Sequence, residues 1–164
     1  MTDEEKRYLR VVVSGMVRDQ RSNPVVLLKM DDGDEVLPIW IGHAEGMAIE
    51  LQMKGQGFER PLTHDLLKTA VESLGATVAK VAVTELRDNT FIAKVYMQRE
   101  NEVYVLDARP SDSIALALKM DAPIFVAEDV FTSHKRIIQT DPLGQQSPDE
   151  ELRRYLENLD PGDF

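Results

Sequence analysis

Two short clusters carry the residue types that could do chemistry. The first consists of Arg60, His64 and Asp65, at a predicted junction between a loop and a helix. A helix N-terminus presents unpaired N–H groups and a positive dipole end, so an anion such as a phosphate could bind there. His64 could move protons near neutral pH, and Arg60 could bind an oxyanion. In the structural alternative, Thr63 and Asp65 only cap the helix and His64 lies on the surface.

The second cluster lies at a predicted turn from a strand into a helix and consists of Asp107, Arg109, Ser111 and Asp112. The carboxylates of Asp107 and Asp112 could share Mg²⁺ or Mn²⁺, with Arg109 holding a phosphoryl group. The alternative is again structural. Ser111 and Asp112 would cap the helix, and an ion pair between Asp107 and Arg109 would fix the turn.

An internal repeat relates the second cluster to an earlier segment. Residues 40–51 align with residues 107–118 at a constant offset of 67. Ala48 and Leu51 recur as identical residues within this span, and Glu35, Val36 and Met53 recur at the same offset outside it. Repeats of this length mark duplicated supersecondary units, so function is expected where the copies differ. The offset also places Glu45 on Asp112, which adds Glu45 to the candidate acidic site.

The elements that must position these residues follow from periodicity and from turn residues. The first copy is predicted as strands 8–17, 24–30 and 36–41 followed by a helix over 43–54. The second is predicted as strands 77–86, 90–97 and 103–106 and a helix that begins at Ser111. A helix over 63–75 joins the copies, and 124–126 is a last short strand. The fold class is therefore α+β, a single domain with a duplicated strand-strand-strand-helix unit and a mainly antiparallel sheet.

Two helices should each bury an apolar stripe. The stripe of the first helix is predicted as Ala44, Met47, Ala48 and Leu51. The stripe of the joining helix is predicted as Leu67, Ala70, Val71 and Leu74, with Thr63 as N-cap and Gly75 after its end.

Composition divides the chain and excludes several classes of site. We expect one domain over residues 1–140 and an acidic linker with a C-terminal helix over 141–164, which carries −5 of the net charge of −10. Without cysteine, the chain has neither disulfides nor thiolate chemistry. The charged N-terminus, followed by a short apolar run, predicts neither a signal peptide nor a membrane span, and hence a cytoplasmic protein. There is no basic stripe for tight, non-specific binding of a polyanion.

Longer strings resemble a known family. The segments LPIWIG (37–42), RPLTHDLL (60–67) and DARPSDSIALAL (107–118) resemble, in order, the bacterial bifunctional nuclease family. The resemblance implies an α+β domain that assembles at least into dimers. It also implies nuclease activity on DNA and RNA, which is attributed to some members, chiefly plant ones.

Two hypotheses of function follow. In the first, the chain is a phosphodiesterase in which Glu45, Asp107 and Asp112 hold Mg²⁺ or Mn²⁺. Arg60 and Arg109 would bind the phosphate of DNA or RNA, and the catalytic set would be His64, Asp65 and Asp107. In the second, the chain is a non-catalytic oligomeric module for binding or regulation. A separation above roughly 10 Å between the two clusters would argue against one shared metal-centred site.

Overall fold

A computed structural model describes residues 5–137, and the predicted linker and helix at 141–164 lie outside these described residues. Its strands form one sheet of eight strands in the order β6-β5-β4-β7-β1-β2-β3-β8. Neighbouring strands are antiparallel except for β4 and β7. The strands are β1 (Tyr8–Arg18), β2 (Pro24–Lys29), β3 (Glu35–Trp40), β4 (Thr77–Arg87), β5 (Thr90–Arg99), β6 (Glu102–Ala108), β7 (Ile124–Ala127) and β8 (Arg136–Ile137). The predicted α+β class with a mainly antiparallel sheet is confirmed.

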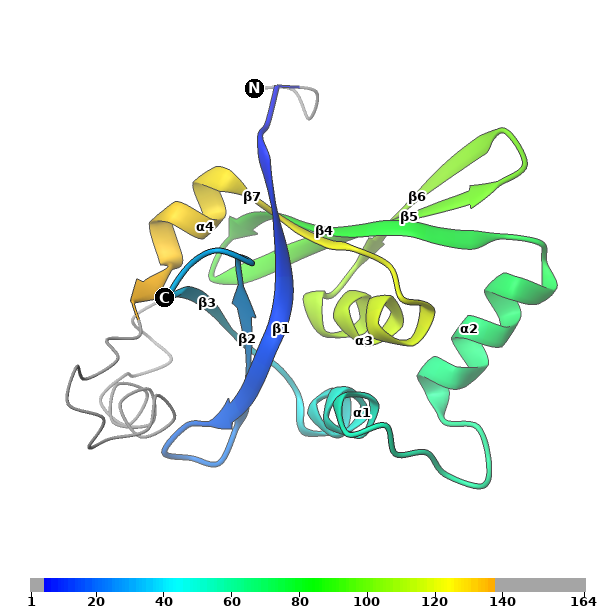
Figure 1. The fold of residues 1–164 in the computed structure, drawn as a ribbon, viewed down its shortest axis with the longest axis horizontal. Coiled ribbons are helices and arrows are strands. Elements are labelled where there is room, and N and C mark those ends of the chain that lie inside the picture. Colours follow the sequence, from blue (N-terminus) through cyan, green and yellow to red (C-terminus); the bar gives the residue numbers. More distant parts are fainter. Residues whose placement is uncertain (1–4, 138–164) are drawn as a thin grey trace.

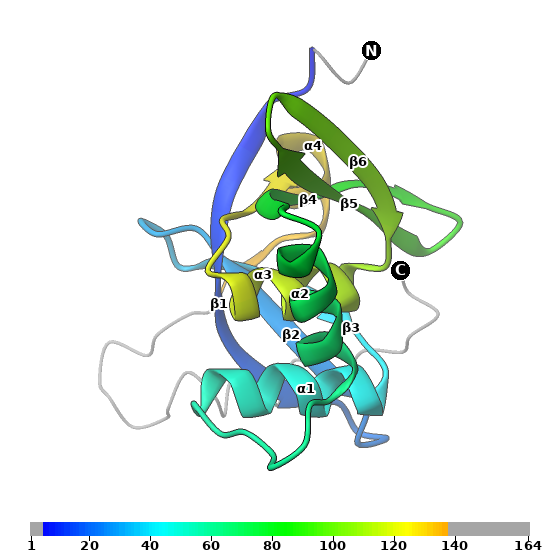
Figure 2. The ribbon, with the colours of Figure 1, turned by 90° about the vertical axis from the view of Figure 1, so that its right-hand side faces the viewer.

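Four helices accompany the sheet: α1 (His43–Met53), α2 (Thr63–Ser73), α3 (Pro110–Met120) and α4 (Glu128–His134). The two halves of the sheet meet at an angle, and α3 lies within that angle with α1 and α2 on the same side (Figures 1 and 2). The side chains of α3 at Ile114, Ala115, Leu116 and Ala117 are almost fully buried in the main core. This burial fixes the start of α3 firmly relative to both halves of the sheet. No helix within residues 5–137 is long and apolar enough to cross a membrane.

The order of elements repeats as the sequence predicted. Helix α1 covers residues 43–53 and α3 covers residues 110–120, so both of their bounds differ by the predicted offset of 67. The two helices pack against each other, and the equivalent residues Gln52 and Lys119 meet there, with Nζ donating to Oε1 at 3.4 Å. That the two copies superpose with the same handedness stays a prediction, to be checked by superposing residues 34–54 on 101–121.

Three expectations about elements were wrong. The short strand at 124–126 is not the last strand, because β8 follows it after the helix α4, which was not expected. Helix α1 turns a different face to the core: Gly46, Ala48 and Ile49 are buried, whereas Ala44 and Met47 are exposed. Gly46 allows this approach, since a Cβ there would lie 2.8 Å from Cγ of Pro24.

The stripe predicted for α2 is also mostly exposed. Leu67 is 41% exposed and Leu74 is 68% exposed, and the buried residues of this helix are His64 and Val71. The physical reason is that α2 packs chiefly against α3 and covers no face of the sheet. The helix ends earlier than predicted: its last residue is Ser73, its C-cap is Leu74, and Gly75 follows the cap with a positive φ of 72°.

Candidate active site

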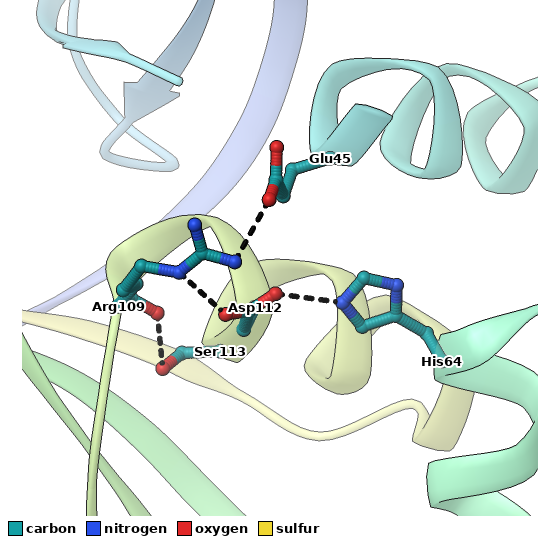
Figure 3. A network of polar contacts seen from close by, with 5 residues as sticks. All are labelled: Glu45, His64, Arg109, Asp112 and Ser113. Atoms are coloured by element: carbon teal, nitrogen blue, oxygen red, sulfur yellow. Dashed lines mark hydrogen bonds and ion pairs between the residues drawn. The ribbon is translucent and has the colours of Figure 1, made fainter. Parts of the chain in front are cut away.

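The two clusters predicted from the sequence meet in one polar network (Figure 3). Asp112 Oδ1 lies 2.9 Å from His64 Nε2, and Asp112 Oδ2 accepts a hydrogen bond of 2.8 Å from Arg109 Nε. Arg109 Nη2 donates a second bond, of 2.8 Å, to Glu45 Oε1. We call these four residues the Asp112 cluster. Because His64 and Asp112 are in contact, the distance criterion for a shared site is met.

The starts of three helices place these side chains. Asp112 and Glu45 are each the third residue of their helix, α3 and α1, where a carboxylate is favoured by the helix dipole. Arg109 immediately precedes α3 with an extended backbone. Gly42 immediately precedes α1, and a Cβ there would collide with Oε2 of Glu45. The glycine therefore leaves room for the Glu45 carboxylate to fold back over the helix start.

The N-cap positions expected from the sequence are wrong, whereas Asp65 does cap α2 by accepting a hydrogen bond from the Leu62 N–H. The residue before α3 is Arg109 rather than Ser111, and the residue before α2 is Leu62 rather than Thr63. Proline is favoured at the first helical position, which explains why α3 already begins at Pro110. The ion pair proposed as a structural alternative also differs, because Arg109 pairs with Asp112 and Glu45.

Hydrogen bonds within the Asp112 cluster stabilise the charged forms of Asp112 and Arg109. Burial opposes ionisation of Asp112, but hydrogen bonds from Arg109 and His64 outweigh it and lower the pKa of its carboxyl group. The hydrogen bonds that Arg109 donates to Asp112 and Glu45 raise the pKa of Arg109. Asp112 is thus a carboxylate at neutral pH and can only accept hydrogen bonds. The proton of the neutral His64 imidazole must then sit on Nε2, which leaves Nδ1 as the acceptor.

Asp65 lies beside the Asp112 cluster and holds a lysine that the sequence analysis missed. Lys119 Nζ lies 2.5 Å from Asp65 Oδ1, and the Leu62 N–H donates to Asp65 Oδ2 at 2.8 Å. The hydrogen bond from Lys119, and then that from Leu62, lower the pKa of Asp65. Lys119 follows Asp112 by seven residues, and this spacing places both on one face of a helix. That periodicity was a signal from which Lys119 could have been found.

Two predicted residues are not part of this network. Arg60 is exposed in the loop before α2. Asp107 is exposed near the end of β6, where its backbone pairs with Lys94 on β5. The geometry brings together Glu45, His64, Arg109 and Asp112, with Asp65 adjacent.

Two cavities flank the Asp112 cluster. The aromatic cavity has a volume of about 460 Å³, and Trp40, Phe91 and Arg109 contribute to its lining. The histidine cavity has a volume of about 250 Å³ and is lined in part by His64 and Lys119. Arg109 and His64 bond to opposite oxygens of Asp112, so this carboxylate links the walls of the two cavities.

Residues 5–137 contain no group of three or more histidine, aspartate or glutamate side chains that could hold a metal ion. Arg109 bonds to both Glu45 and Asp112, and Asp107 stands outside the cluster. Mg²⁺ is often held by one or two carboxylates together with the phosphates of a substrate. A dependence on Mg²⁺ or Mn²⁺ therefore stays a prediction for experiment.

Comparison with known proteins gives the family. Residues 26–139 match the model of the bifunctional nuclease domain. An uncharacterized protein of Mycobacterium tuberculosis is 35% identical over 159 residues, which are 93% of this chain and 95% of that protein. Bifunctional nuclease 1 of Oryza sativa subsp. indica is 27% identical over 131 residues, which are 77% of this chain and 40% of the plant protein. Bifunctional nuclease 1 of Arabidopsis thaliana is 26% identical over 139 residues, with coverages of 82% and 43%.

The match to the family model covers well over half of the chain, and the mycobacterial relative matches along nearly its whole length. The chain spans less than half the length of these two plant relatives. The long strings noted in the sequence lie within or overlap the matched region. This chain belongs to the bifunctional nuclease domain family.

Proposed function

We propose that this chain hydrolyses phosphodiester bonds of DNA, RNA or both at the Asp112 cluster. One observation carries the proposal: a single carboxylate orients an imidazole on one side and a guanidinium on the other. An oriented imidazole can transfer protons, and an exposed guanidinium can bind phosphate. The family and the names of the plant relatives support the reaction class.

Arg109 is the proposed phosphate-binding residue. Its side chain is 65% exposed, although two of its nitrogens bond to carboxylates. The third nitrogen, Nη1, makes no hydrogen bond within residues 5–137. A non-bridging phosphate oxygen could accept from this nitrogen without displacing the existing bonds.

His64 is the proposed proton-transfer residue, with Asp112 as its positioning residue. In the neutral ring, Nδ1 can accept a proton from an attacking water while Nε2 stays bonded to Asp112. The water oxygen forms the new bond to phosphorus, and the bond from phosphorus to the leaving sugar oxygen breaks. The proton taken up by His64 then passes to that oxygen, so the ring returns to its neutral state. Hydrolysis thus consumes one water and leaves the enzyme unchanged.

A divalent cation is part of the proposal for an electrostatic reason. The Asp112 cluster holds two carboxylates and one permanent cation, and the whole chain has a net charge of −10. Such a field opposes the approach of a phosphodiester, and a cation would screen it. Asp107 and Glu45 remain the further candidate ligands predicted from the sequence, and Arg60 remains a candidate contact to substrate.

Assembly into a homodimer or larger oligomer is also proposed. Four consecutive apolar residues of the edge strand β6 are between 42% and 61% exposed: Val103, Tyr104, Val105 and Leu106. Exposed apolar edge strands are prone to pairing with another chain, and soluble proteins rarely leave them uncovered. A second copy of this chain is the simplest cover.

Cleavage of fluorogenic single-stranded DNA and RNA by Asp112→Asn and Asp107→Asn tests the extent of the site. We expect Asp112→Asn to lower the rate about 10- to 100-fold, because the neutral amide no longer enforces the tautomer and position of His64. A comparable loss in Asp107→Asn would bring Asp107 into the site, whereas an unchanged rate would confine the site to the Asp112 cluster. If neither Asp112→Asn nor Arg109→Gln lowers the rate, the observed nuclease is a contaminant and the chain is the non-catalytic module.

A further inference from the structure

Apart from Arg109, the residues that line the aromatic cavity have no role in the proposed hydrolysis. It is formed by the end of β3, the turn between β4 and β5, and the starts of α1 and α3. Its lining residues include two aromatic residues, Trp40 and Phe91, and two asparagines, Asn23 and Asn89. Arg109, the proposed phosphate-binding residue, lies on the same wall as the start of α3. The volume of about 460 Å³ lies within the usual range for small-ligand sites.

We propose that the aromatic cavity is a nucleobase subsite, which holds one base of the substrate while Arg109 binds the adjoining phosphate. This inference rests on the proposed function, since it extends the same site toward its substrate. Aromatic side chains stack on any base, and amides offer both a donor and an acceptor to a base edge. In a nucleotide, an anionic phosphate is joined through the sugar to a flat base. The protein offers the matching groups side by side, with the guanidinium of Arg109 for the phosphate and the aromatic and amide residues for the base.

One wall of the subsite is held in place by a buried carboxylate. Asp19 is only 9% exposed, and its Oδ2 accepts hydrogen bonds from Trp40 Nε1 at 3.1 Å and from Asn23 Nδ2 at 3.0 Å. Its Oδ1 accepts from the backbone N–H groups of Arg21 and Asn23. Four bonds to one carboxylate fix the indole and the amide before any ligand arrives. Binding then costs little ordering of these side chains.

The facing wall is also set by local structure. Asp88 and Asn89 form the turn between β4 and β5 with positive φ angles of 49° and 59°. Consecutive left-handed residues are typical of the tight hairpin turns that match the twist of the sheet. Phe91 follows this turn and packs edge-to-face on His134, with ring centroids 5.9 Å apart. The turn thus presents Asn89 to the cavity from a rigid hairpin.

The single tryptophan of the chain provides a direct measurement, because stacking of a base on Trp40 quenches its fluorescence. The protein is titrated with AMP, UMP and ribose 5-phosphate, which share a phosphate and a ribose while the last lacks a base. We expect AMP or UMP to quench Trp40 in a saturable manner and to bind at least about tenfold more tightly than ribose 5-phosphate. Equal affinity for all three, or no binding of either nucleotide up to about 10 mM, would overturn the subsite.

A matched pair of turn variants tests which residue reads the base. Asn89→Gly and Asp88→Gly both preserve the positive φ of the turn, but Asn89 alone of the two lines the cavity. We expect Asn89→Gly to weaken AMP binding about fivefold to tenfold and Asp88→Gly to change it less than about twofold. Equal effects of the two variants would contradict a contact from Asn89.

Binding of AMP requires no cleavage, so the two proposals can fail separately. Base-dependent quenching in a protein that cleaves nothing would keep the subsite and remove the nuclease. Cleavage that depends on His64 without any base-dependent binding would keep the nuclease and remove the subsite. In an active enzyme, Asn89→Gly should raise KM and leave kcat nearly unchanged, because the base contact is made equally in the ground state and the transition state.

Discussion

Glu45 and Asp112 occupy equivalent positions in the two copies of the repeat, and both accept a hydrogen bond from the same guanidinium, that of Arg109. Each is the third residue of its helix. The residue equivalent to Arg109 in the first copy is Gly42, which has no side chain to donate. At these aligned positions the two segments therefore supply two carboxylates but one cation, and the three side chains meet in one cluster.

Replacing Arg109 by lysine should lower stability. The guanidinium bonds to two carboxylates through two separate nitrogens, and the single ammonium group of lysine cannot reproduce this geometry. We expect the free energy of unfolding of Arg109→Lys to fall by about 1–3 kcal/mol in urea titrations. The control is Arg87→Lys, which alters the exposed pair with Glu85 and should change stability by less than about 0.5 kcal/mol. Equal effects at the two positions would mean that Arg109 is an ordinary surface residue.

Stability should depend on pH through Asp65. The pKa of Asp65 is lower in the folded chain than its ordinary value of 3.8, so the unfolded chain binds the proton more readily. The stabilisation is therefore complete well above pH 3.8 and is lost as the pH falls through the folded-state pKa. Asp65→Asn should be about 0.5–1 kcal/mol less stable than the wild type at pH 7, because solvent screens this partly exposed pair. That difference should shrink in urea titrations toward pH 3, and a constant difference over this range would refute the role of the Asp65 charge.

The oligomeric state should depend on the exposed face of β6. Light scattering at micromolar concentration is expected to give at least twice the chain mass of 18.5 kDa. Val105→Lys places a charge on that face and should shift the protein toward the monomer. Val12→Lys changes an exposed valine of β1 and should leave the mass unchanged. A wild type that is purely monomeric would remove the prediction.

Nuclease activity should require a divalent cation. We expect the cleavage rate to fall in EDTA and to return with Mg²⁺ or Mn²⁺, because the carboxylates of the Asp112 cluster outnumber its permanent cation. Thermal melts with and without EDTA provide the control, and we expect equal melting temperatures because residues 5–137 hold no three-ligand metal group. An undiminished rate in EDTA would leave His64 and Arg109 to act without a metal.

Most of the fold could be predicted from local sequence patterns. Most of the site could not, because it depends on contacts between residues far apart in the sequence. The helix at 43–54 and the strands around it could be predicted because periodicity and turn residues are local signals. The contact between His64 and Asp112 joins residues 48 apart in sequence, and no spacing rule predicts such a contact. The exposed face of α2 was mispredicted for a related reason. An apolar stripe shows which face of a helix is favoured for burial. It does not show whether this chain or another one covers that face.

The claim that His64 transfers the proton is tested most directly by comparing His64→Gln with His43→Gln. Both variants replace one histidine near a helix start, but His43 is exposed at the first position of α1 whereas His64 bonds to Asp112. Each is purified identically and assayed on single-stranded DNA and RNA, with folding checked by circular dichroism. We expect His64→Gln to lose at least about 100-fold in kcat and His43→Gln to keep the wild-type rate. A folded His64→Gln protein that cleaves as fast as the wild type would contradict the assignment of the Asp112 cluster as the active site.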